Sequence, residues 1–119
     1  MLTKKKKLPI FLDNLEEITT HNKHFRHVIY TSNNLQLVLM SLNPGEEIGE
    51  EVHSNVDQFF RIETGKGEII ADNKVYRISD GDGILIPKGT VHNIRNTGAT
   101  ALKLYTLYSP PQHKQGLVE

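Results

Sequence analysis

Short runs of apolar residues recur along the chain, and clusters of Gly, Pro, Asn and Asp separate them. These four residue types supply the backbone angles that tight turns require. Many short strands with turns between them are typical of an all-β sandwich or barrel. The pattern predicts strands over residues 25–30, 35–42, 58–63, 68–71, 75–78, 83–86, 91–95 and 101–108.

Three segments depart from this strand pattern. Residues 12–20, with the sequence LDNLEEITT, predict a short helix. The segment ETGKGE places Gly65 and Gly67 between two predicted strands, where we expect a tight hairpin. Residues 109–119 contain two adjacent prolines and little apolar content, so they predict an extended tail.

Alternation within the strands indicates which side chains face inward, because successive side chains of a strand point to opposite faces. In the strand 58–63, Gln58 shares a face with Phe60 and Ile62. The two apolar residues mark this face as buried, so the amide of Gln58 is expected to face inward as well. Arg61 falls on the opposite face.

The same parity brings other polar groups inward. Glu51 and His53 share a face before the loop SNVD, and His92 shares a face with Ile94, while Arg95 faces away. A carboxylate, two imidazoles and an amide are costly to bury alone, but together they form a ligand set for a divalent cation. The alternative is a polar core network that holds water. The predicted metal ligands are Glu51, His53, Gln58 and His92.

Composition narrows the class of protein. A length of 119 residues suits one domain, and 14 basic residues balance 14 acidic ones, which gives no general attraction to nucleic acid or to an anionic membrane. The run Lys4–Lys7 has no accompanying aromatic or basic stripe, so we expect a solvated tail. The absence of cysteine excludes disulfides. No apolar run suits a membrane helix or a signal peptide, so a cytoplasmic protein is expected.

Two spacings resemble the motifs of the cupin superfamily. The first cupin motif has the form G-x5-H-x-H-x3,4-E-x6-G, and its spacing is matched by Gly45, Glu51, His53, Gln58 and Gly65. The second has the form G-x5-P-x-G-x2-H-x3-N, which GDGILIPKGTVHNIRN matches throughout. The arrangement E-x-H…Q and the ending YSPP are similar to small single-domain cupins labelled mannose-6-phosphate isomerase-like.

The resemblance implies a double-stranded β-helix, or jelly-roll barrel, over residues 35–108, with an N-terminal arm and first strand over 1–34 and a tail over 109–119. The first motif departs from the usual one, with Glu51 in place of histidine and Gln58 in place of glutamate. Both ligand sets carry one negative charge, so we interpret the departure as a compensated variant. It implies one divalent ion, and Fe²⁺, Mn²⁺, Ni²⁺ and Zn²⁺ are all candidates.

Three functions fit such a site. The first is isomerisation or ring opening of a sugar or uronate, and cupins that act on unsaturated uronates use a glutamine ligand, which Gln58 resembles. The second is a dioxygenase, and the third is a binding module without catalysis. Phe60, Ile62 and Ile94 are expected to line the substrate pocket, and no general base is identified. The resemblance also implies a homodimer, in which the arm LPIFLDNLEEI extends the partner's sheet.

A second group of histidines is spaced three residues apart, at His21, His24 and His27. We interpret them as solvated surface residues, with incidental capture of an ion such as nickel as the alternative.

Overall fold

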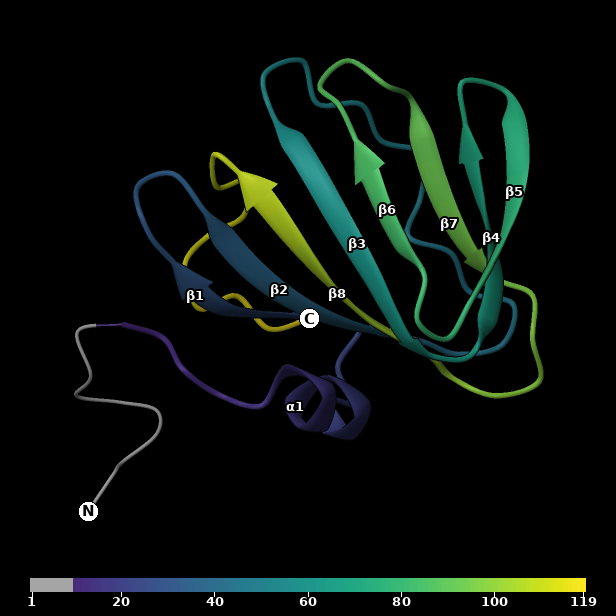
Figure 1. Ribbon diagram of the computed structural model, residues 1–119, viewed down its shortest axis with the longest axis horizontal. Helices are drawn as coiled ribbons and strands as arrows, with labels where there is room; N and C mark the ends of the chain where they lie inside the picture. Colours follow the sequence, from purple (N-terminus) through teal and green to yellow (C-terminus); the bar gives the residue numbers. More distant parts are fainter. Residues whose placement is uncertain (1–9) are drawn as a thin grey trace.

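The computed structural model describes residues 10–119, so the run Lys4–Lys7 lies outside the described residues (Figure 1). One helix and eight strands follow in chain order: α1 (Leu15–His21), β1 (Arg26–Thr31), β2 (Gln36–Leu42), β3 (Asp57–Thr64), β4 (Lys66–Ala71), β5 (Lys74–Ser79), β6 (Gly83–Ile86), β7 (His92–Asn96) and β8 (Leu102–Ser109). Each predicted strand is present, which confirms the all-β prediction.

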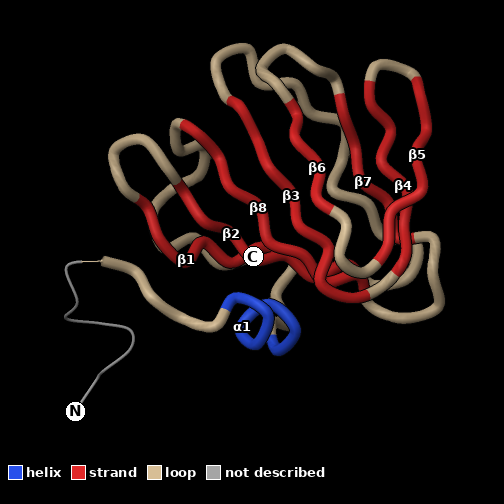
Figure 2. The backbone as a smooth tube through the Cα atoms, in the orientation of Figure 1, coloured by secondary structure: helices blue, strands red, loops and turns tan. Residues whose placement is uncertain are grey.

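The strands form two antiparallel sheets (Figure 2). One sheet has the order β1-β2-β8-β3-β6, and the other has the order β5-β4-β7. The hydrophobic core lies between them and draws on both, with Val38, Ile62 and Leu104 from the larger sheet and Ile69 and Ile94 from the smaller one. The chain is therefore a small β-sandwich with one short helix beside it.

The helix covers the outer face of the larger sheet. It begins after Asn14, whose side-chain Oδ1 accepts a 2.8 Å hydrogen bond from the Glu17 N–H, so the predicted segment 12–20 becomes helical only from residue 15. It lies against β8 and β3. Every residue of β2 is buried, because Val38 and Met40 face the core while Leu37 and Leu39 face the N-terminal segment.

The predicted hairpin at Gly65 and Gly67 is wrong. The strands on either side, β3 and β4, belong to different sheets, so the segment is a crossover between the two sheets. Gly65 has a φ of +107°, and its N–H donates a 2.7 Å hydrogen bond to Asp80 Oδ1. At Gly67 a Cβ would lie 2.4 Å from the carbonyl oxygen of Arg95, so close approach of β4 to β7 requires glycine there.

The segment 47–51 runs antiparallel to β7 and adds to the edge of the smaller sheet. Bridges join Glu47 to Arg95 and Glu51 to His92. The Glu51 N–H donates to the His92 carbonyl at 2.8 Å, and the His92 N–H donates to the Glu51 carbonyl at 2.9 Å. This reciprocal pair places the two motif segments side by side.

Residues after β8 fold back onto the larger sheet. The side chain of Gln36, which is fully buried, accepts hydrogen bonds from the Gln112 and His113 N–H groups at 3.0 and 2.9 Å. Its Nε2 donates to the His113 carbonyl at 2.8 Å. Further along, Val118 bridges to His27 at the outer edge of β1. The tail is thus fixed against the barrel, and it covers an otherwise open sheet edge.

Candidate metal centre

Three of the four predicted ligands converge at one end of the sandwich. Ligand atoms of Glu51, His53 and His92 all lie within 4.8 Å of one another. Glu51 Oε1 is 3.7 Å from His53 Nε2 and 3.9 Å from His92 Nε2. Gln58 belongs to the same cluster, because its Oε1 lies 3.2 Å from His92 Nε2. The structure therefore brings together all four side chains that the sequence singled out.

Separate elements position these ligands. Gln58 and His92 stand on β3 and β7, whereas Glu51 is placed by its reciprocal backbone bonds to His92. His53 lies in the loop between Glu51 and β3, where its carbonyl accepts a 2.8 Å hydrogen bond from the Gly89 N–H. The turn that contains Gly89 therefore ties the two motif segments together.

Hydrogen bonds to the far side of two ligands set their orientation. His92 Nδ1 lies 2.9 Å from the Thr90 carbonyl, which can only accept, so the proton is on Nδ1 and Nε2 carries a lone pair toward the cluster. Gln58 Nε2 donates to Thr106 Oγ1 at 2.9 Å, which turns the amide oxygen toward His92. Both side chains thus present lone pairs to the same point.

The cluster fits a divalent cation. Glu51 Oε1 and His53 Nε2 are buried and have no hydrogen-bond partner among the described residues, which is costly unless a cation binds them. Two ligand atoms at about 2.1 Å from one ion are about 3.0 Å apart at a right angle and about 3.4 Å apart at a tetrahedral angle. At a tetrahedral angle the observed separations of 3.7 and 3.9 Å must shorten by about 0.3 and 0.5 Å, and the separation of 3.2 Å needs no contraction.

Burial gives the cluster an inner and an outer side. The His92 side chain is 3% exposed, whereas those of His53 and Glu51 are 13% and 22% exposed. Glu51 and His53 therefore lie nearer to solvent than His92 does. Glu51 is the only formal anion of the four, and its neighbours Glu46, Glu47 and Glu50 are exposed.

The predicted pocket residues are buried. Phe60, Ile62 and Ile94 are at most 1% exposed and belong to the hydrophobic core. The ring of Phe60 contacts that of His92, with centroids 6.0 Å apart. Phe60 thus packs against a ligand, and the role of the three residues in lining a pocket and setting substrate size stays a prediction.

Tyr108 and His113 adjoin the cluster, and the sequence reasoning did not assign either to the site. The Tyr108 ring is edge-on to His53, with centroids 5.9 Å apart, and its hydroxyl lies 3.2 Å from His113 Nε2. Burial, and then the charge of Glu51, raise the pKa of the Tyr108 phenol well above its ordinary value. Alternation along β8 could have found Tyr108, because it has the same parity as inward Leu104.

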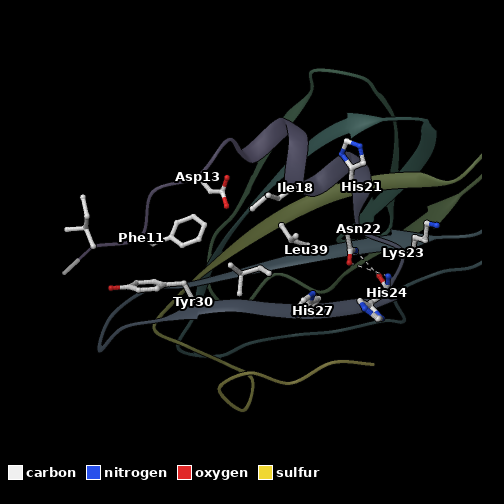
Figure 3. Close-up of a pocket in the computed structure, with 12 residues that line it drawn as sticks. Phe11, Asp13, Ile18, His21, Asn22, Lys23, His24, His27, Tyr30 and Leu39 are labelled. Carbon is white, nitrogen blue, oxygen red and sulfur yellow. Dashed lines mark hydrogen bonds between the residues drawn. The ribbon is translucent and has the colours of Figure 1, made fainter. Parts of the chain in front are cut away.

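The other histidines border a different cavity of about 770 Å³, between the N-terminal segment and the outer face of β1 and β2 (Figure 3). His21 and His24 are exposed, as expected for solvated surface residues, and His27 is half-buried. The His24 and His27 rings meet edge to face, with centroids 5.3 Å apart. Among residues 10–119 these three histidines do not form a group with metal-binding separations.

The family follows from comparison with known proteins. The model of the cupin domain matches residues 38–108. The chain is a cupin. This cupin is 44% identical over 114 residues to the Bacillus subtilis protein YrkC and 43% identical over 114 residues to the Acanthamoeba polyphaga mimivirus protein L612. These matches cover 91% and 92% of the chain, and 61% and 71% of the two relatives.

A solved structure shows the same cupin fold over almost the whole chain. The crystal structure of BH2720 from Bacillus halodurans superposes with a TM-score of 0.92 and 42% identity, and it covers 99% of this cupin and 93% of the other chain. The double-stranded β-helix prediction is thus confirmed. The family match ends at residue 108, so His113 lies beyond the matched residues.

Proposed function

We propose that this cupin is a metal-dependent enzyme that acts on a small hydroxy-carbonyl compound, such as a sugar or a uronate. One observation supports the proposal most directly. Glu51 Oε1, His53 Nε2 and His92 Nε2 converge, and two of these buried atoms have no hydrogen-bond partner within residues 10–119. A bound divalent cation would satisfy both of these atoms at once.

The residues have distinct roles in this proposal. Glu51 supplies the negative charge, the two imidazoles supply neutral donors, and Gln58 supplies an amide oxygen whose direction Thr106 fixes. A divalent ion held there would polarise a carbonyl and stabilise negative charge on the neighbouring oxygen. Phe60 excludes water beneath His92. Together these features suit isomerisation or ring opening better than redox chemistry that needs a second cofactor.

A second candidate is a dioxygenase, and the composition of the triad favours it. Two histidines and one carboxylate with open positions are the usual ligands of non-haem Fe²⁺ in oxygenases. The identity of the ion separates the two candidates, because isomerisation proceeds with Zn²⁺ or Mn²⁺ and without air.

Elemental analysis of the purified protein is the first test, and we expect about one divalent ion per chain. The second is a screen of sugars, uronates and small phenols, run with and without air, with Glu51→Gln as the inactive control. Turnover without air supports the isomerase, and strict oxygen dependence supports the dioxygenase. Saturable binding of a small molecule without turnover would instead indicate a binding module, and a protein without metal would overturn the proposal.

Two further predictions belong to the same proposal. No helix among residues 10–119 has the length and hydropathy that a membrane crossing needs. A cytoplasmic location and the absence of a nucleic-acid partner stay predictions, which fractionation and a filter-binding assay would test.

A further inference from the structure

Tyr108 is the last inward-facing residue of β8 and is 1% exposed. It is paired with Gln58 on β3 and with Gln36 on β2. The first of these partners is a predicted ligand, and the second holds the tail. Tyr108 therefore stands between the metal centre and the segment that follows β8.

The ring of Tyr108 borders the metal centre. The ring meets His53 edge-on at a centroid distance of 5.9 Å. On the neighbouring strand, Gln58 is the register partner of Tyr108. Tyr108 thus lies beside two of the ligands, His53 and Gln58, and an ordinary phenol carries its proton at neutral pH.

His113 holds the other side of the hydroxyl. Its Nε2 lies 3.2 Å from the phenol oxygen, and the two rings meet edge to face with centroids 5.1 Å apart. The backbone of His113 is fixed on both sides, because its N–H donates to Gln36 Oε1 and its carbonyl accepts from Gln36 Nε2. The imidazole is therefore held in place by a residue that is itself fully buried.

We propose that the Tyr108 hydroxyl, held by His113, is a hydrogen-bond donor to an oxygen atom of the small molecule that binds at the metal centre. This inference rests on the proposed function and names the residue that orients the ligand. A hydroxyl has one proton and can accept as well. When a ligand oxygen is present, the His113 Nε2–H donates a hydrogen bond to the phenol oxygen, and the phenol O–H donates a hydrogen bond to the ligand oxygen.

The chemistry of this donor selects the class of ligand. A neutral phenol stabilises a carbonyl, carboxylate or alkoxide oxygen, and it offers nothing comparable to an amine that already carries its own protons. The Tyr108 hydroxyl lies beside the metal ligands and is not one of them. It can therefore bind a second oxygen of a small molecule whose first oxygen lies at the metal centre. A hydroxy-carbonyl or hydroxy-carboxylate compound has that arrangement.

Calorimetry on the full chain loaded with Zn²⁺ tests the inference, with glycolate as the oxygen probe and imidazole as a probe that has no oxygen. Tyr108→Phe should weaken glycolate binding about tenfold, or ~1.4 kcal/mol, as expected for one hydrogen bond. Imidazole and Zn²⁺ affinities should change by less than about twofold. Tyr105→Phe is the matched control, because Tyr105 lies on the same strand with the opposite parity, and it should leave all three affinities unchanged.

Nitrogen-15 NMR of His113 in the unmodified protein gives a second measurement that needs no variant. Glycolate should convert the imidazole to the form with its proton on Nε2, and imidazole as a probe should not. Unchanged glycolate affinity in Tyr108→Phe, an equal loss of Zn²⁺ affinity, or no response of His113 would overturn the inference. So would a Zn²⁺-loaded protein that does not bind glycolate. Failure to bind any metal would instead overturn the proposed function.

Discussion

Replacement of Glu51 by Gln tests the charge on which the metal centre depends. The two side chains have nearly the same size, so the change removes the charge and keeps an oxygen in place. Glu51 Oε1 has no hydrogen-bond partner within residues 10–119 and lies 3.7 and 3.9 Å from the two imidazole nitrogens. The metal-free variant should therefore fold as well as the unmodified protein.

The loss of metal affinity can be estimated from the geometry. Two unit charges about 4 Å apart interact by roughly 4 kcal/mol at an effective dielectric constant of about 20. A divalent ion in direct contact is attracted more strongly, but the amide oxygen and a water ligand recover part of the difference. We expect a net loss of about 3–4 kcal/mol, which weakens binding by roughly two to three orders of magnitude.

A second pair of variants tests whether metal affinity depends on the net charge of the ligand set or on which residue carries the carboxylate. Glu51→His alone should also weaken binding, because Gln58 supplies no charge and no formal anion then remains among the four ligands. Combining Glu51→His with Gln58→Glu restores one negative charge and the usual cupin ligand set. Binding should recover in that double variant. Glu50→Gln, in the exposed neighbour, is the control and should have no effect.

Isothermal titration of each metal-free protein with Mn²⁺ and with Zn²⁺ measures these differences directly. The reasoning fails if Glu50→Gln weakens binding as much as Glu51→Gln does. It also fails if the double variant binds no better than Glu51→His, since charge compensation between the two positions would then be absent.

Three other predictions concern the tail, pH and assembly. Gln36→Leu should cost about 2–4 kcal/mol in urea unfolding, because three tail groups lose their partner, whereas Gln112→Ala should change stability by less than about 0.5 kcal/mol. Burial, and then the charge of Arg26, lower the pKa of His113 in the folded chain. Below a pH of about 6.5, the ordinary pKa of histidine, the unfolded chain therefore binds more protons than the folded chain does. Stability should fall as the pH drops through that range, and His113→Gln should reduce the fall; an unchanged profile would contradict this. Light scattering should give a homodimer. Leu12→Glu combined with Leu35→Glu should give a monomer, because both residues are 45% exposed and line one groove beside the N-terminal segment.

Much of the fold could be predicted from local pattern. Alternation placed Phe60 and Ile62 in the core, and each predicted strand exists within a few residues of its expected bounds. The turn at Gly65 shows where local reasoning ends. A glycine with positive φ is recognisable from its neighbours, but which strands pair on either side depends on distant residues. β3 pairs with β8 and β6, and neither is adjacent to it in the chain.

The site was predictable to the same extent. Motif spacing brought Glu51, His53, Gln58 and His92 to attention, and all four converge in the structure. Strand alternation could have placed Tyr108 on the inward face, but its phenol carried no ligand chemistry that would single it out. The position of His113 could not be predicted from the sequence, because it depends on hydrogen bonds to Gln36, which is 77 residues away in the chain.

The order of strands in the larger sheet has a consequence for synthesis. Its central strand, β8, is the last strand of the fold to leave the ribosome, and it separates β2 from β3. Until β8 arrives, β2 has an unpaired edge and two apolar faces, each of which is buried only in the finished protein. The sheet therefore closes late in translation, through contacts between residues about 65 positions apart. Until that strand has been made, residues 36–42 should be the segment of the nascent chain most exposed to aggregation.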